Sequence, residues 1–159
     1  MSENTAKKAW LATEDGLFFE GRSVGAPGQA IGELVFTTDM VGYQELITDP
    51  YYKDKILTFA MTQVGNYGVN AADSSSDAHT PRGIVVREMC FKPSNWRSEE
   101  SLPDYLKRQG TLAIEGIDTR MLVRHVRDNA ALYAVISTEC GDKDELIAAA
   151  KRKREENHQ

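Results

Sequence analysis

The sequence has few cysteines, and the ones it has form no recognisable motif. Cys90 and Cys140 are the two cysteines of a 159-residue chain, and their wide separation argues against a disulfide framework and against a CxxC zinc site. A nucleophilic thiol on a strand-to-helix turn would need a G-x-C-x-G setting. Neither Glu-Met-Cys-Phe-Lys nor Glu-Cys-Gly provides that setting. We therefore expect both cysteines to be structural or incidental.

Histidine is also scarce, and phosphate-binding signatures are missing. His79, His125 and His158 do not have metal-ligand spacing. His125 could act as a base, but a solvated histidine on a helix face is the favoured interpretation. No GxxxxGK[ST] motif is present, and the glycines between residues 21 and 28 lack the spacing of a dinucleotide fingerprint. The sequence predicts no catalytic residue and no metal site on this chain.

Long hydrophobic runs and a positive charge balance are absent too. The longest apolar run near the N-terminus, residues 9–12, is too short for a signal peptide, and no run approaches the roughly 20 residues that span a bilayer. The net charge of −5 provides no global positive field for a phosphate backbone. We expect a cytoplasmic protein with no nucleic-acid partner and no membrane partner.

What the sequence does contain is the pattern of one α/β domain. Strands are predicted at residues 9–13, 17–22, 31–37, 55–61, 83–88, 112–114 and 132–137. The first two are expected to form a hairpin, in which Asp15-Gly16 supplies a turn that needs a positive φ. Ser101 and Asp118 are expected to cap helices that end near residues 110 and 128. The strand at 112–114, the helix after it and the strand at 132–137 predict a right-handed crossover between a parallel pair.

The chain is expected to divide into a domain at residues 1–140 and a tail at 141–159. The tail is rich in charge and predicts an exposed helix or a linker.

Several loops have compositions too specific for simple connections, above all GYQELITDPYY at 42–52. In this loop Pro50 fixes its own φ and biases Asp49 away from the helical region. The Asp49 carboxylate can accept hydrogen bonds from the backbone amides that follow it. This geometry would aim Tyr51 outward.

Seven such segments, in this order and at these separations, closely resemble the N-terminal domain of the glutamine-hydrolysing carbamoyl-phosphate synthase small chain. The resemblance runs from about residue 10 to 138. The segments are Glu14-Asp15-Gly16, Gly32-Glu33-Leu34-Val35-Phe36, GYQELITDPYY, Val64-Gly65-Asn66-Tyr67-Gly68, Pro93-Ser94-Asn95-Trp96-Arg97, Tyr105-Leu106-Lys107-Arg108 and Gly116-Ile117-Asp118-Thr119-Arg120.

The resemblance implies a three-layer β/β/α domain with mixed sheets, and it implies two partners. One is a class I glutaminase domain of the same small chain, and the other is the carbamoyl-phosphate synthase large subunit. ATP and Mg would then be bound by the large subunit, with no cofactor on this chain. The complete enzyme would make carbamoyl phosphate from glutamine, bicarbonate and ATP, for arginine and pyrimidine synthesis. The thiol nucleophile would belong to the glutaminase domain.

The resemblance also assigns roles to individual residues. Tyr51 stands where the family has a serine that touches bound glutamine, so we expect Tyr51 to form a lid on the glutamine site, with Asp49 and Pro50 shaping its loop. On residue type alone, Tyr67 and Trp96 are large aromatic residues in polar loops and are expected at a partner interface; the alternative is that they fold back over the sheet edges. The family's Thr-Tyr-Pro is replaced here by Ala60-Met61-Thr62, without its rigid proline.

Two alternatives stay open at this point. The chain is either an excised domain or a natural split chain, and it is either a docking domain of the ligase or a free-standing interaction or regulatory module that reuses this fold. A G-x-C-x-G motif downstream of residue 159 would favour the ligase.

Overall fold

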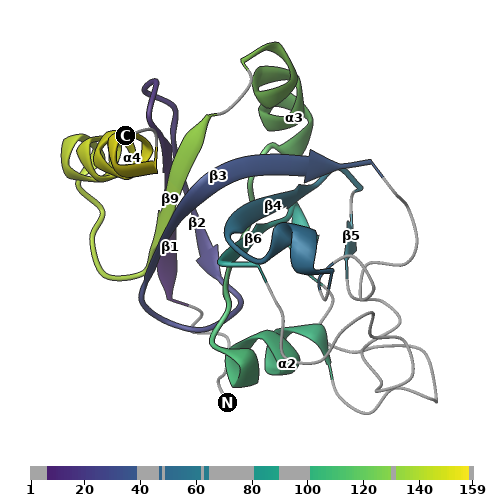
Figure 1. The fold of residues 1–159 in the computed structure, drawn as a ribbon. Helices are drawn as coiled ribbons and strands as arrows, with labels where there is room; N and C mark the ends of the chain where they lie inside the picture. The colour runs from purple at the N-terminus through teal and green to yellow at the C-terminus, as the bar shows by residue number, and fades with distance from the viewer. Residues whose placement is uncertain are drawn as a thin grey trace.

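The fold is built on a closed β-barrel (Figure 1). The computed structural model describes residues 7–38, 47, 49–61, 63–64, 81–89, 101–129 and 132–157. The barrel strands, in the order in which they neighbour one another, are β1 (Lys8–Thr13), β2 (Phe18–Ser23), β8 (Leu112–Glu115), β6 (Gly83–Val85), β4 (Lys55–Phe59), β3 (Gln29–Thr37) and β9 (Tyr133–Ser137). A small second sheet pairs β5 (Gln63–Val64) with β7 (Glu88–Met89).

Strand direction divides the barrel into two parts. The strands β3, β4, β6 and β8 run parallel, whereas β1, β2 and β9 join them through antiparallel pairs. The predicted parallel pairing of the 112–114 strand with the 132–137 strand is wrong. β8 is already paired with β2 and β6, and β9 with β1 and β3, so neither strand has a free edge for the other.

The first two strands form the predicted hairpin, and Gly16 occupies the position that needs a positive φ (109°). Thr13 braces the turn from both sides. Its hydroxyl donates to Asp15 Oδ1 at 2.5 Å and accepts from the Leu17 amide at 3.0 Å. The local sequence therefore determines this turn.

Helix α2 (Leu102–Gln109) has the predicted cap at each end. The Ser101 hydroxyl accepts a hydrogen bond from the Asp104 amide at 3.3 Å, and Gly110 adopts a left-handed conformation (φ 76°). Helix α3 (Thr119–Asp128) begins as predicted at Asp118, whose carboxylate accepts from the Met121 amide at 3.1 Å. Both predictions are confirmed.

The interior of the barrel forms the first of three apolar clusters. Its fully buried members include Leu11, Ile56, Ile114 and Ile136 from four different strands, and Leu122 of α3 packs against them. Helix α3 therefore contributes to the barrel core.

The other two clusters join the outside of the barrel to helices. One lies under α2 and contains Leu57, Phe59, Ile84, Leu102 and Leu106. The other lies under α4 (Lys143–Asn157) on the opposite wall and is built around Ala12, Val135 and Leu146. The predicted α/β class with mixed β-structure is confirmed, and the β layers are opposite walls of one barrel (Figure 1).

The tail differs from its prediction in one respect. It is a helix, but it is not exposed all round, because Leu146, Ala149 and Ala150 are buried. These positions are spaced i, i+3 and i+4 and form one apolar stripe. The dense charges on either side of this stripe hide it in the sequence.

Candidate functional site

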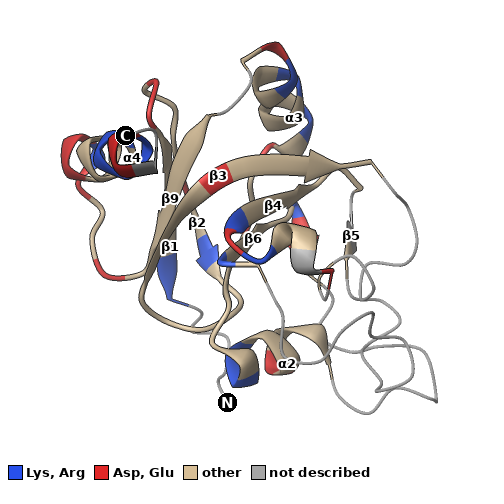
Figure 2. Cartoon of the chain, viewed as in Figure 1, with Lys and Arg blue, Asp and Glu red and all other residues tan. Residues whose placement is uncertain are grey.

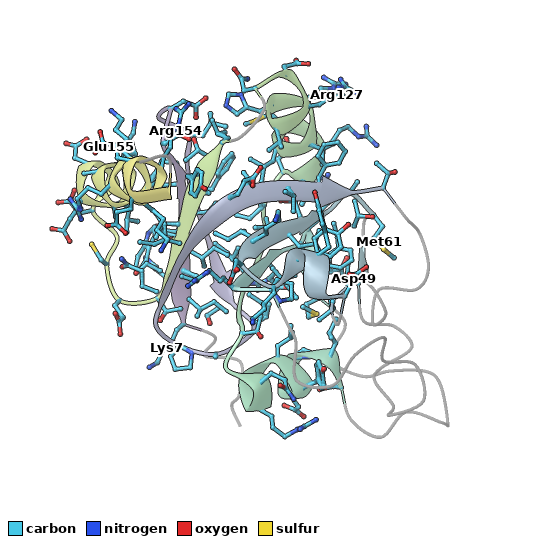
Figure 3. The ribbon with its side chains drawn as sticks, in the orientation of Figure 1. Lys7, Asp49, Met61, Arg127, Arg154 and Glu155 are labelled. Carbon is cyan, nitrogen blue, oxygen red and sulfur yellow. The ribbon has the colours of Figure 1, made fainter. Side chains whose placement is uncertain are left out.

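The loop that contains Tyr51 has a defined backbone conformation. Pro50 begins the short 3-10 helix η1 (Pro50–Tyr52). The Asp49 carboxylate accepts a hydrogen bond from the Tyr51 amide at 2.9 Å, and the Asp49 carbonyl accepts from the Tyr52 amide at 3.0 Å. Asp49, which lies next to η1 (Figure 3), thus fixes the backbone conformation of Tyr51 through these two hydrogen bonds.

The two tyrosines of this loop point to different environments. Tyr52 is half-buried and packs against the apolar cluster under α2, near the fully buried Ile47. Tyr51 is 63% exposed, the largest exposure among the described large apolar side chains. The anchored neighbour fixes the backbone while Tyr51 projects into solvent.

Lys55 supports the exposed ring from one side. Its ammonium lies 4.6 Å from the centroid of the Tyr51 ring and 3.3 Å from the Tyr51 carbonyl oxygen. The Tyr51 and Tyr52 rings meet edge to face, with centroids 4.9 Å apart. These contacts restrict the ring before any partner binds, and restriction of this kind reduces the entropy cost of binding.

Asp49, Pro50 and Tyr51 are therefore brought together by the structure, while their roles at a glutamine site stay predictions. Tyr67 and Trp96, the predicted interface residues, lie outside the described residues.

His125 is not a freely solvated histidine, contrary to the favoured interpretation. Its Nε2 lies 2.6 Å from Asp15 Oδ2, and Asp15 also accepts the Thr13 hydroxyl. In a nucleophile–base–acid arrangement the histidine would stand between the hydroxyl and the carboxylate. Here the carboxylate is in the middle, so the group joins the β1–β2 hairpin to α3 and is not arranged for hydroxyl activation.

Cys140 belongs to the structure that starts α4. The Asp142 amide donates to Cys140 Sγ at 3.5 Å, and the thiol itself donates to Glu145 Oε2 at 3.1 Å. The hydrogen bond from Asp142 lowers the pKa of the thiol. The hydrogen bond to Glu145, partial burial and the two nearby carboxylates outweigh it and raise the pKa above its ordinary value. A raised pKa is unfavourable for a nucleophile.

Two carboxylates that are buried in the structure, Glu14 and Glu115, were not identified from the sequence. Glu14 accepts hydrogen bonds from the Tyr133 amide at 2.7 Å and from Arg154 at 2.8 Å, so it joins the hairpin to β9 and α4. Glu115 accepts from the Met89 amide at 2.9 Å and pairs with Arg22 at 2.8 Å. Each is a structural residue. Glu115 at the end of an otherwise apolar strand was the available signal, because a charged side chain is seldom fully buried without a partner.

Positively charged residues recur along α3 (Figure 2). Arg120, Arg124 and Arg127 are all exposed on this helix. Of these three arginines, only Arg127 forms an ion pair with a described residue. That pair, to Asp128 at 3.8 Å, is weak. Met121, on the same helix, is 40% exposed. We call Arg120, Met121, Arg124 and Arg127 the α3 face.

The described part of the chain has neither a metal-ligand cluster nor a membrane-spanning helix. No cluster of three or more His, Cys, Asp or Glu side chains there could hold a metal ion. No helix in the ranges that the structure covers is long and apolar enough to cross a membrane.

Comparison with known proteins places residues 11–136 in the family model described as carbamoyl-phosphate synthase small chain, CPSase domain. The small chain of Nitratidesulfovibrio vulgaris strain Miyazaki F is 48% identical over 144 residues, which cover 91% of this chain and 38% of the relative. The small chain of Thermosynechococcus vestitus is 52% identical over 139 residues, covering 87% and 36%. The chain thus spans less than two fifths of the length of these relatives.

A solved structure, an aminopeptidase from Aneurinibacillus sp. strain AM-1, aligns over 81% of this chain and 30% of its own. Its TM-score of 0.44 and its 14% identity are too low to support an argument.

Proposed function

The chain belongs to the carbamoyl-phosphate synthase small-chain family, and we propose that it acts as the non-catalytic N-terminal domain of that subunit. In this role it docks on the large subunit and helps to close the glutamine site of a class I glutaminase domain. The complete enzyme then makes carbamoyl phosphate from glutamine, bicarbonate and ATP, with ATP and Mg bound by the large subunit.

The observation that carries the pocket-closing role is the Tyr51 loop. Asp49 fixes the backbone, Tyr52 anchors it to the core, and Tyr51 is left 63% exposed. A preorganised, exposed aromatic residue is suited to covering another domain's pocket. The Tyr51 hydroxyl lies several bonds farther from the backbone than a serine hydroxyl would, so the ring acts mainly by its shape. A hydrogen bond from that hydroxyl adds only about 0.5–1.5 kcal/mol.

Kinetics of the complete enzyme test this role. Tyr51→Ser and Tyr51→Ala should raise the glutamine KM by about tenfold or less, which corresponds to about 1.4 kcal/mol. Ammonia-dependent synthesis should not change, since ammonia bypasses the glutaminase site. Lys53→Ala is the matched control, because Lys53 is an exposed neighbour in the same loop. If both Tyr51 variants keep the wild-type KM for glutamine, Tyr51 does not act as a lid on the glutamine site.

The non-catalytic status has a simpler test. The isolated chain should release no ammonia from glutamine, and release that Cys90→Ala abolishes would contradict the proposal.

For the docking role, the α3 face is the candidate that the described residues support best. Arginine and methionine are enriched at protein interfaces, and Arg120 and Arg124 have no ion pair within the described residues. The proposed occupant is an acidic surface of the large subunit. Burying these arginines against carboxylates would add charge-assisted hydrogen bonds.

Binding measurements with the large subunit check this surface. The double variant Arg120→Glu, Arg124→Glu should weaken binding at least tenfold and reduce its dependence on salt. The control Lys151→Glu, Arg152→Glu makes the same charge change on an exposed part of α4 and should have little effect. Equal losses from the two double variants would point to net charge instead of the α3 face.

A further inference from the structure

A small pocket with three cationic side chains shares Lys55 with the surroundings of the Tyr51 ring, but includes neither Tyr51 nor any residue of the α3 face. Its volume is about 210 Å³, and its lining comes from five separate parts of the chain: β3, β4 with the turn before it, the residue before β6, β9 and α4. The lining residues are Gly32, Glu33, Asp54, Lys55, Arg82, Tyr133 and Lys153. Three of them are cations and two are anions, so the lining is net positive in a chain whose net charge is −5.

The backbone keeps this pocket from being filled. A Cβ on Gly32 would lie 2.7 Å from the Asp54 carbonyl oxygen, which is closer than real contacts allow. Gly32 is therefore required by the close approach of β3 to the turn before β4. Gly32 lines the pocket without adding a side chain to it.

The cations of the pocket are poorly neutralised by the protein. Lys153 is half-buried and makes no hydrogen bond or ion pair with any residue that the structure describes. Lys55 is half-buried, and its ammonium contacts the ring and the carbonyl oxygen of Tyr51, which are both neutral groups. Arg82 lies 3.7 Å from Asp54, and both side chains are largely exposed, so this pair is weak. Partly desolvated ammonium groups without a carboxylate partner are costly unless an anion meets them.

We propose that this pocket binds a small tetrahedral oxyanion, such as inorganic phosphate or a small phosphate monoester. The cations come from three separate parts of the chain, which suits the several outward-facing oxygens of a dianion better than the two coplanar oxygens of a single carboxylate. The pocket is smaller than the usual 300–1,000 Å³ of a drug-sized site, so the ligand is small. Two lining carboxylates, Glu33 and Asp54, oppose the ligand, and the charge of Asp54 is partly offset by Arg82.

Titration of the purified chain with inorganic phosphate tests the proposal. Amide NMR shifts are followed at constant ionic strength, kept with chloride. Gly32 and Lys55 should show saturable shifts with one common midpoint. The α3 amides of Arg120 and Arg124 serve as an internal control, because those arginines are also cationic but do not line this pocket. A second titration with methyl phosphate distinguishes a site for free phosphate from a site for phosphate monoesters.

Variants should move the midpoint in opposite directions. Lys153→Gln removes an attractive charge and should weaken binding about tenfold, whereas Glu33→Gln removes a repulsive charge and should tighten binding several-fold. Lys151→Gln is the matched control, since it removes the same charge from the same helix outside the pocket.

Three outcomes would overturn the site. They are shifts that do not saturate, α3 shifts with the same midpoint as Gly32, and equal effects of Lys153→Gln and Lys151→Gln. Lys55 is common to the pocket and to the Tyr51 loop, but the variants used here change Lys153 and Glu33, so their outcomes are separate from the kinetic test of the Tyr51 lid.

Discussion

Replacing Leu146 with alanine should destabilise the chain by about 3 kcal/mol, because Leu146 holds α4 against the barrel wall. Its side chain is 1% exposed and lies in the cluster formed by Ala12 and Val135 of the barrel, with Trp10, Phe18 and Ile31 around it. Truncating a buried leucine costs about 2.7–5 kcal/mol, and the low end applies where the surroundings can collapse. Here one wall of the cavity is a single helix that can shift inward.

Urea unfolding followed by circular dichroism measures this effect. With a slope of about 2 kcal/mol/M, the loss of about 3 kcal/mol corresponds to a midpoint lower by about 1.5 M. Leu122→Ala, at a fully buried position of α3 that packs against the barrel core, is the positive control and should cost as much or more. Lys143→Ala, at an exposed position of α4, should change the midpoint by less than about 0.25 M.

A Leu146→Ala midpoint within about 0.5 M of the parent chain would refute the reasoning. It would mean that α4 does not dock on the barrel in solution and that the tail behaves as the exposed helix or linker suggested by its charges.

Two further predictions concern a buried carboxylate and a thiol. Glu115→Ala leaves the Met89 amide without its acceptor in a buried site and should cost about 2–3 kcal/mol in the same unfolding assay. The control is Glu20→Ala, which should cost less than about 1 kcal/mol because the Lys8–Glu20 pair is exposed. Equal losses of stability in the two variants would contradict the structural role assigned to the buried Glu115. Because the pKa of Cys140 is raised, less thiolate is present near pH 8 than for an ordinary cysteine, and alkylation by iodoacetamide should be slow there and accelerate at higher pH. In a Cys90→Ser background, Glu145→Gln should lower that pKa and speed alkylation at pH 8, and an unchanged or slower rate would contradict the assigned cause.

The features that could be predicted from the sequence are those with local causes. The turn at Gly16, the caps at Ser101 and Asp118, and the hydrogen bond from the Tyr51 amide to Asp49 each join residues no more than four positions apart. In such cases the identity of one or two residues decides the conformation, so reading the sequence in short windows is sufficient.

Features that depend on distant residues could not be predicted in this way. The barrel closes because Trp10 lies opposite Ser137 and Arg22 opposite Glu115, and nothing in the local pattern at these positions specifies the partner. The expected parallel crossover was wrong for the same reason, since each strand's periodicity is compatible with several neighbours.

The pocket proposed to bind an oxyanion could not be predicted from the sequence either. Lys55, Arg82 and Lys153 are far apart in the chain, and separately they look like ordinary surface cations. Helix α4 shows the same limit on a smaller scale. Its buried stripe at Leu146, Ala149 and Ala150 is short and surrounded by charges, so its composition favoured an exposed segment.

The pairing of β1 with β9 has a consequence for how the chain is made. Trp10 leaves the ribosome roughly 130 residues before its partner Ser137, which at about 5–20 residues per second is a delay of about 6 to 25 seconds. During that interval β1 can pair with β2, but its other edge and the antiparallel edge of β3 have no partner. Exposed edges of apolar strands are templates for association with other chains. The nascent chain is therefore most vulnerable to aggregation just before synthesis reaches β9, and the arrival of that single strand closes both edges at once.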